Sequence, residues 1–370
     1  MSEWKTVRLG DVCEILDSKR VPITAHERKN GSYPYYGANG IQDYVADYIF
    51  DDELVLLAED GGNFGSKEKP IAYRVSGKCW VNNHAHVLKP KECLDVDYLC
   101  DSIKFYDVST IVNGATRQKL TQSAMVEMKI FLPPLETQKQ IAKQLNKCTT
   151  LLAKHKQMLE TYDTLIKSRF IEMFGDPSNN TKYPYKNVGE FTTVTSGGTP
   201  DRKNNEYWKN GKIPWVKTTE LQNNELTEVE EFITQKGLDE SSAKMMPKGT
   251  LLIAMYGQGK TRGMTAYLGI EASTNQACAC ILPSKEINQR YLWYYFILSY
   301  DKLRDLAKGG NQPNLNGNMI KSFPVLMPPI DMQNKYVSFV QQIDKSKFTV
   351  QKSLEKAETL YKSLMQQYFA

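Results

Sequence analysis

Apolar residues recur at alternating steps of four and three along two long stretches of this chain. The first stretch follows Pro134 and reaches Phe174 without another Gly or Pro, and the second repeats it 195 positions later. This spacing is typical of helices that pair with other helices. Pro134 suits a first helical turn, and Gly175 with Pro177 forms a strong stop signal. We therefore expect two helices of about 40 residues, each roughly 60 Å long at about 1.5 Å per residue.

The apolar seam of either helix would be exposed if that helix stood alone, so we expect the two seams to pack together. Pairing within one chain costs little entropy. We expect an antiparallel pair, because the second globular region can then follow the first helix with little linker; a parallel pair is the alternative. His155, Arg169 and Lys347 interrupt the seam and either set its register or contact a partner subunit. The expected seam residues are Ile141, Leu145, Leu152, Leu159, Tyr162, Ile166, Val340, Ile343, Val350, Leu354, Tyr361 and Leu364.

The two halves of the chain are related by an internal repeat, which indicates two similar units. The segment Ile130–Gln138 matches Val325–Gln333, and Leu54–Ala58 matches Leu251–Ala254 after small slips in alignment. Each half contains a divergent region, a double-proline junction and a long helix. We therefore predict globular domains at 1–132 and 177–327 and long helices at 133–176 and 328–370.

The divergent regions have the pattern of mixed α/β domains. Short β-like runs are bounded by Gly, Asn and Pro, and a short helix follows the last run in each region. The runs are Leu54–Ala58, Trp80–Leu88, Leu251–Met255 and Ala277–Leu282, and the helices lie near Tyr98–Tyr106 and Tyr291–Leu306. The predicted fold class is α/β: two similar domains separated by two long helices that form an antiparallel coiled coil, with a pseudo-two-fold internal repeat.

The composition narrows the functional classes only a little. A net charge of +5, from 47 basic and 42 acidic residues, permits an anionic partner without requiring one. The most apolar run, 291–298, is far shorter than the roughly 18 residues of a membrane helix, and residues 1–5 lack the apolar core of a signal peptide. Seven scattered cysteines are typical of a reduced protein. We expect a cytoplasmic protein that does not bind membranes.

Many loops of the globular regions carry hydrogen-bond donors that suit DNA. Arg and Lys can bond guanine, Asn and Gln can bond adenine, and Lys also pairs with phosphates. The alternative interpretation is that most of these side chains are solvated loop residues. The candidates are Asn63, Lys67, Lys69, Arg74, Asn82, Asn83, His84 and Arg117 in the first region, and Lys217, Thr218, Thr219, Gln258, Lys260, Thr261, Arg262, Asn275 and Gln276 in the second.

Two motifs could in principle bind a phosphate or a metal, but both signals are weak. The segment Ala254–Thr261 resembles a relaxed phosphate loop, but two glycines and β-like residues follow it, whereas a phosphate loop must lead into a helix. His84 and His86 would share one face of a strand, as would Cys278 and Cys280, but two ligands do not complete a zinc site. We expect no metal, no catalytic residues and no cofactor in this chain.

Four segments in a fixed order carry a family resemblance. They are Trp4–Val12, Leu132–Gln138, Phe174–Pro177 and Gly310–Leu315. With the repeated domain-and-helix plan, they resemble the specificity subunit of a type I restriction–modification enzyme, and the resemblance covers essentially the whole chain.

The resemblance implies a non-catalytic subunit in which each globular domain reads half of a bipartite, asymmetric site on double-stranded DNA. It implies that the helices fix the gap between the half-sites and bind two methyltransferase subunits, which use S-adenosylmethionine to methylate adenine. Restriction subunits with ATP- and Mg-dependent translocase activity could join them. One alternative is a scaffolding protein with a long helical hairpin. Another is a stand-alone enzyme with an active site built from distant residues.

Overall fold

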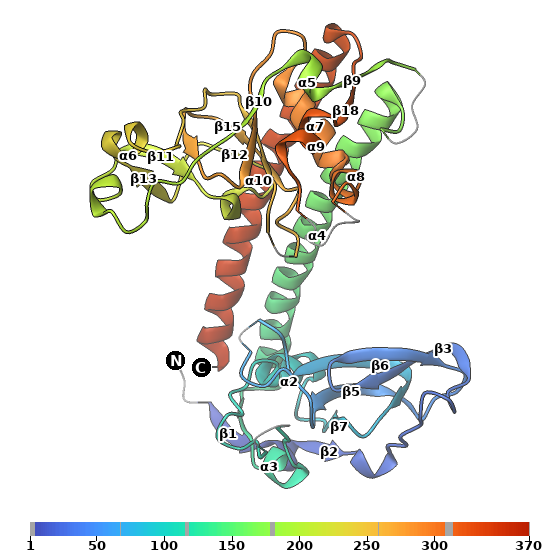
Figure 1. Ribbon diagram of the computed structural model, residues 1–370. Coiled ribbons are helices and arrows are strands. Elements are labelled where there is room, and N and C mark those ends of the chain that lie inside the picture. The colour runs from blue at the N-terminus through green and yellow to red at the C-terminus, as the bar shows by residue number, and fades with distance from the viewer. Residues whose placement is uncertain are drawn as a thin grey trace. The chain divides into compact units, whose positions relative to one another are not determined.

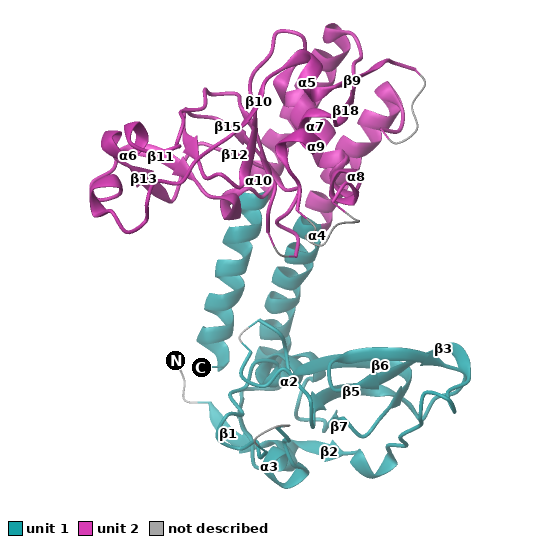
Figure 2. Ribbon diagram, in the orientation of Figure 1, with its two compact units in different colours: residues 1–156, 351–370 teal, residues 157–350 magenta. Residues whose placement is uncertain are grey.

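The computed structural model describes residues 4–66, 68–114, 118–177, 182–257, 259–307 and 314–369. The chain divides into two compact units, one made of Met1–Lys156 with Gln351–Ala370 and the other of Gln157–Val350 (Figure 2). Both divisions fall inside a long helix, α4 (Leu135–Phe174) or α10 (Ile330–Phe369) (Figure 1). Each unit therefore contains a globular part and one segment of each long helix.

The globular part of the first unit is a mixed α/β domain. Its elements are β1 (Lys5–Arg8), α1 (Leu9–Val12), β2 (Cys13–Ile15), η1 (Asp17–Lys19), β3 (Asn30–Gly37), β4 (Gly40–Val45), β5 (Phe50–Ala58), β6 (Ala72–Val81), β7 (Ala85–Pro90), α2 (Val96–Ile103), α3 (Gln122–Val126) and β8 (Lys129–Leu132). Six strands form one sheet in the order β2-β7-β5-β6-β3-β4, in which only β3 and β6 pair in parallel. The antiparallel pair β1–β8 places the start of the chain beside the junction with α4.

The second unit repeats this plan with an added lobe. Its elements are β9 (Tyr185–Asn187), α5 (Val188–Phe191), β10 (Val194–Ser196), η2 (Asn205–Tyr207), β11 (Ile213–Val216), η3 (Thr218–Glu220), β12 (Asn224–Leu226), β13 (Glu231–Ile233), α6 (Gln235–Asp239), β14 (Leu251–Ala254), β15 (Thr265–Leu268), β16 (Ser273–Thr274), β17 (Cys278–Ile281), α7 (Gln289–Leu298), α8 (Tyr300–Asp305), α9 (Gly317–Lys321) and β18 (Pro324–Leu326). The main sheet has the order β10-β17-β14-β15-β12, and β13-β11-β16 form the lobe. The pair β18–β9 repeats β1–β8.

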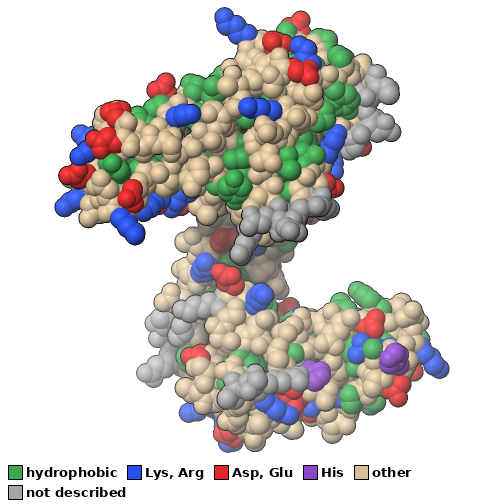
Figure 3. All heavy atoms as spheres, in the orientation of Figure 1, with side chains coloured by type: hydrophobic (Ala, Val, Ile, Leu, Met, Phe, Trp, Pro, Cys, Tyr) green, Lys and Arg blue, Asp and Glu red, His purple; other side chains and the backbone are tan. Residues whose placement is uncertain are grey.

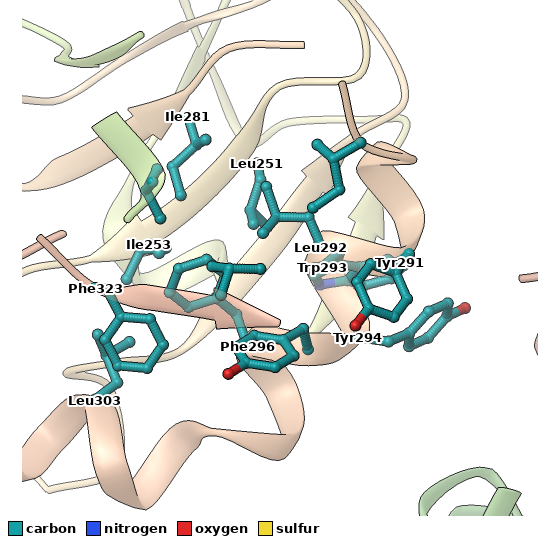
Figure 4. Packing of buried hydrophobic residues seen from close by; sticks show 14 of the residues in the cluster. Leu251, Ile253, Ile281, Tyr291, Leu292, Trp293, Tyr294, Phe296, Leu303 and Phe323 are labelled. Carbon is teal, nitrogen blue, oxygen red and sulfur yellow. The ribbon is translucent and has the colours of Figure 1, made fainter. Parts of the chain in front are cut away.

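Each main sheet is buried on both faces, which explains the continuous apolar runs in its central strands. On β5, Val55 and Leu57 join the cluster that includes α2, whereas Leu54 and Leu56 join a second cluster. On β14, Leu251 and Ile253 share a cluster with the aromatic residues of α7 (Figure 4), whereas Leu252 and Ala254 belong to another cluster.

A tyrosine at the same place in both units ties the domain to its own junction. Tyr98 of α2 donates a hydrogen bond from its hydroxyl to the carbonyl oxygen of Phe131 at 2.9 Å. Tyr291 of α7 makes the equivalent bond to Leu326 at 3.1 Å. Because both rings are fully buried, each tyrosine fixes a domain helix against the strand that leads into a long helix.

The two long helices run antiparallel within each unit. In the first unit, the Tyr368 hydroxyl bonds Gln144, and Lys156 approaches Glu358 at 4.0 Å. Residue numbers therefore rise along α4 as they fall along α10. In the second unit, Lys347 bonds Asp163 at 2.6 Å, and the Tyr336 hydroxyl bonds the Ile166 carbonyl at 3.3 Å. The predicted fold class is confirmed in its mixed α/β domains, its internal repeat and its antiparallel long helices.

All twelve expected seam residues are buried or half-buried. Ile141 and Leu145 share a cluster with Tyr361 and Leu364 in the first unit. In the last turns of α4, however, the most deeply buried side chains are Phe170 and Phe174, which the heptad pattern placed beside the seam. They pack into the core of the second unit instead, where the Phe170 ring lies 5.4 Å from that of Tyr336.

The predicted strand Trp80–Leu88 is wrong as a single element. Strand β6 ends at Val81 and β7 begins at Ala85, with Asn82, Asn83 and His84 in the turn between them. Both halves of the run have β-like residues, so alternation alone could not locate the turn. Among the described helices, none has the length and apolarity needed to span a membrane.

Candidate nucleic-acid interface

Three turns of the first unit meet in a group of polar side chains, which we call the amide edge: Asn39, Gln42, Asp60, Asn63, Asn82, Asn83 and His84. The Asn63 amide donates to Asn39 at 3.1 Å, and the Asn82 amide donates to Gln42 at 3.0 Å. His84 Nδ1 lies 2.6 Å from an Asp60 carboxylate oxygen. Candidates separated in sequence are thus brought to one end of the six-stranded sheet, next to the β3–β4 turn.

Asn39 and Gln42 were missed in the sequence. Asn39 precedes Gly40, which has a φ of 109°, in the tight turn between β3 and β4. An Asn-Gly pair between two strand-like runs is a strong hairpin signal and could have located this turn. Asn39, Gln42 and Asn83 are exposed, so their amides can accept partners from outside the protein.

Arg74 does not belong to this edge. It lies on β6, where its guanidinium forms ion pairs with Glu53 and with Asp97, the latter at 3.1 Å. Lys69 is exposed near the turn after β5. The candidates Lys67 and Arg117 lie outside the described residues.

In the second unit, candidates from the β11–η3 and β16–β17 turns lie together. The Asn275 backbone N–H bonds the Val216 carbonyl at 3.0 Å, directly before Lys217. Gln276 is exposed and bonds the Thr199 hydroxyl, a contact that the sequence did not indicate. The Asn275 side-chain oxygen is buried and has no hydrogen-bond partner among the described residues.

The basic group of Lys217 is already paired within the protein. Its ammonium lies 2.8 Å from Glu230 and 3.0 Å from Glu231, and hydrogen bonds to these carboxylates raise the lysine pKa. Thr218 and Thr219 follow in η3, where Thr218 is half-buried and Thr219 is exposed. Figure 3 shows Lys and Arg side chains interspersed with Asp and Glu over the lobe that carries β11 and β13. This lobe has mixed charge, so a continuous basic surface is not its distinguishing feature.

The phosphate-loop-like segment is a turn between strands. It joins β14 to β15, and no helix follows it. The Tyr300 hydroxyl bonds the Lys260 carbonyl at 2.6 Å, and Arg304 bonds the Arg262 carbonyl at 2.8 Å. Lys260 is exposed and Thr261 is half-buried, whereas Gln258 lies outside the described residues. Because this turn leads into a strand and not into a helix, it lacks the helix N-terminus that holds phosphates in a phosphate loop, as the sequence argument predicts.

The interpretation that His84 and His86 share a strand face is wrong, because His84 lies in the turn before β7. His86 is buried on β7, where Nδ1 lies 2.6 Å from Asp17 and Nε2 lies 2.8 Å from the Leu120 carbonyl. Cys278 and Cys280 do share a face of β17, in one apolar cluster.

Asp17, Glu59 and His86 are close enough to hold a metal ion, which the sequence did not indicate. Two cations already neutralise this group. Arg20 bonds Glu59 at 2.6 Å, and Lys119 lies 2.8 Å from it. Burial disfavours the Glu59 carboxylate, but hydrogen bonds from Lys119 and Arg20 outweigh burial and lower its pKa. The group is best described as an ion-pair network that fixes β7 and the segment before Leu120.

The amino-acid sequence matches the type I restriction modification DNA specificity domain family twice, over residues 1–161 and 180–358. The chain belongs to this family. A Haemophilus influenzae protein named as a type I restriction enzyme specificity subunit is 27% identical over 357 residues, covering 92% of this chain and 87% of the relative. The Methanocaldococcus jannaschii MjaVIII specificity subunit is 22% identical over 397 residues, covering 98% of this chain and 91% of the relative.

Solved structures share the fold of this specificity-domain protein. The crystal structure of a type I restriction-modification system S subunit from M. genitalium has a TM-score of 0.69 and 14% identity, and the match covers 100% of this chain and 96% of that one. The two specificity-domain matches correspond to the two repeated units. The amide edge and the Lys217–Gln276 turns therefore lie in separate copies of one domain type.

Proposed function

We propose that this chain is the DNA-recognition subunit of a type I restriction–modification complex. The globular domains predicted at 1–132 and 177–327 are its target-recognition domains, and each reads one half of a bipartite site on double-stranded DNA. The observation that carries the proposal is the presence of two specificity domains in one chain whose polar turns differ in chemistry.

That difference supports an asymmetric site. The first domain offers exposed amides of Asn39, Gln42 and Asn83, which suit adenine. The second offers Lys260 together with Gln276 and Thr219, a set that also suits phosphates and guanine. Unlike side chains in equivalent places should select unlike half-sites.

In this proposal the chain has no chemistry of its own. Two methyltransferase subunits that use S-adenosylmethionine bind it and methylate adenine, and restriction subunits that use ATP and Mg can join them. A scaffolding role without DNA recognition finds no support in the family relationship.

The first experiment is co-expression with the neighbouring methyltransferase gene, followed by sequencing of host DNA for methylated adenine. We expect methylation at one bipartite, asymmetric motif that is lost when this chain is omitted. A stable complex that methylates DNA without sequence preference would contradict the proposal.

The proposal also gives the long helices the role of a ruler between half-sites, which we expect about one DNA turn, near 10 bp, apart. One heptad inserted after Lys156 and one after Val350 would preserve the helix register. Each insertion adds about 10 Å of helix, or about three base pairs of DNA. We expect the gap in the methylated motif to lengthen, whereas an unchanged gap would exclude the ruler role.

A further inference from the structure

The exposed amide of Gln42 on β4 is held by a chain of two hydrogen bonds that begins at the backbone. The His84 N–H donates to the side-chain oxygen of Asn82 at 2.8 Å. The side-chain nitrogen of Asn82 donates to the side-chain oxygen of Gln42 at 3.0 Å. Asn82 is only 3% exposed, so both bonds are largely shielded from water. Asn82 therefore links a backbone donor to an amide at the surface.

The direction of this chain decides which end of the Gln42 amide faces outward. A backbone N–H can only donate, so the atom of Asn82 that faces it must be the oxygen. The Asn82 nitrogen is then turned toward Gln42, and this donor needs the Gln42 oxygen opposite it. Gln42 Nε2 is left with no hydrogen-bond partner in the described part of the chain. Its N–H groups are therefore available to an acceptor outside the protein.

The support beneath the Gln42 amide is itself fixed to β3. The Asn82 N–H donates to the Tyr36 carbonyl at 3.0 Å, which continues the parallel pairing of β3 with β6. Gly37 follows Tyr36 on β3, and a Cβ at this position would overlap Nε2 and Cδ of Gln42. The amide thus lies across a residue that has no side chain, and a larger residue there would displace it.

Two other exposed amides among the DNA-contact candidates lack a fixed direction. The Asn83 side chain makes no hydrogen bond with the residues that the structure describes, so either end can face a partner. In the second unit, Gln276 contacts the hydroxyl of Thr199, which can donate or accept by rotating. Of these three amides, only Gln42 has its direction set by a backbone group.

The bases of DNA differ in the group that an outward N–H donor would meet in the major groove. Guanine and thymine present a keto oxygen, O6 or O4, whereas adenine and cytosine present an amino group, N6 or N4. The donor bonds a keto oxygen but opposes an amino group, which is itself a donor. Gln42 lies on the β3–β4 hairpin, and a two-stranded ribbon of this kind fits the major groove.

We propose that Gln42 selects a keto base, guanine or thymine, at one position of the half-site read by the first domain, and that Asn82 is the positioning residue for this choice. The inference rests on the proposed function, which supplies the DNA. It narrows the general match of amides to adenine. Bonding adenine N6 requires an outward amide oxygen, and Asn82 holds the Gln42 oxygen inward.

The test reverses the outward group in two independent ways. In Gln42→Glu, an oxygen replaces the outward nitrogen, and the other oxygen still accepts from Asn82. In Asn82→Asp, one carboxylate oxygen still accepts from the His84 N–H, and the other should draw Nε2 of Gln42 inward and turn its oxygen outward. Each variant is co-expressed with the methyltransferase, and host DNA is sequenced for methylated adenine. We expect both variants to prefer adenine or cytosine at the same single position, with the methylation ratio shifted roughly tenfold from the wild type.

Two further variants control for loss of direction and for added charge. Asn82→Ala removes the bond that sets the direction, so we expect keto and amino bases to be methylated alike at that position. Gln140→Glu adds the same charge at an exposed site on α4 and should keep the wild-type motif. Thermal unfolding checks that each variant folds. Gln42→Glu changes an exposed side chain, so it tests the inference even if Asn82→Asp unfolds.

A wild-type motif that persists in folded Gln42→Glu would overturn the inference. A choice between A·T and G·C pairs that ignores keto and amino groups would also overturn it, by placing Gln42 in the minor groove. A keto base retained in folded Asn82→Asp would remove Asn82 from its positioning role. These three results leave the proposed function standing, whereas a wild-type complex that methylates no bipartite motif would overturn both.

Discussion

Gln138 and Gln333 make the same two hydrogen bonds in the two units. The Gln138 side-chain oxygen accepts from the Asp95 N–H, and its nitrogen donates to the Pro133 carbonyl, both at 2.8 Å. Gln333 accepts from the Asn288 N–H and donates to the Pro328 carbonyl, again both at 2.8 Å. Both glutamines are buried. Each joins the N-cap of a domain helix to the double-proline junction, and with Tyr98 or Tyr291 it fixes that domain on its long helix.

Replacing Gln138 with Ala should destabilise the first unit. The change leaves the Asp95 N–H and the Pro133 carbonyl without this partner, and each buried unsatisfied group costs about 1–3 kcal/mol. Thermal unfolding of Gln138→Ala should therefore show a lower melting temperature for the first unit. Gln333→Ala should lower the melting temperature of the second unit in the same way. Gln140→Ala, at an exposed position of the same helix, is the control. Equal melting curves for Gln138→Ala and Gln140→Ala would argue against a stabilising role for the Gln138 hydrogen bonds.

The cysteines should differ sharply in reactivity. Burial raises the pKa of Cys13 and of Cys79 to about 12, so neither thiol forms much thiolate near neutral pH. Cys93 is exposed. Brief treatment of the native protein with iodoacetamide should label Cys93 first, and Cys13 and Cys79 only after denaturant is added. Mass spectrometry of peptides checks this, with Cys93→Ser as the control. Early labelling of Cys79 would show that the sheet opens readily.

The Glu59 network should make the first unit sensitive to acid. The folded-state pKa of Glu59 is lowered, so its stabilising effect is complete above the ordinary glutamate pKa of about 4.3 and is lost as pH falls below that value. Glu59→Gln should lower stability near pH 7 and flatten the decline in stability between about pH 5 and pH 3. Urea unfolding across this range measures the effect, with exposed Glu92→Gln as the control. A decline as steep in Glu59→Gln as in the wild type would contradict the assignment.

Two of the DNA-contact candidates should behave in opposite ways. Asn83→Ala removes an exposed amide, so we expect altered methylation at one half-site with an unchanged melting temperature. Arg74→Gln removes ion pairs with Glu53 and Asp97, so we expect lower stability and an unchanged motif. Methylated-motif sequencing and thermal unfolding of both variants check this. A changed motif in stable Arg74→Gln protein would return Arg74 to the DNA interface.

The sequence determined the features that depend on local periodicity and end signals. The heptad spacing and the proline and glycine signals predicted a long helix at 133–176, and the observed helix Leu135–Phe174 begins and ends two residues inside these bounds. The shift of 195 positions placed the second. Helix hydrogen bonds and caps join residues a few positions apart, so their signals can be read along the chain.

Only the tertiary structure decided which distant side chains meet. It grouped Asn39 with Asn63, and it placed His86 between Asp17 and the Leu120 carbonyl. It also buried Phe170 in the core of the second unit, although the helical repeat placed this residue beside the seam. These contacts are set by strand order and packing between segments far apart in sequence. A periodic pattern gives the face on which a side chain lies, but it does not give the partner across that face.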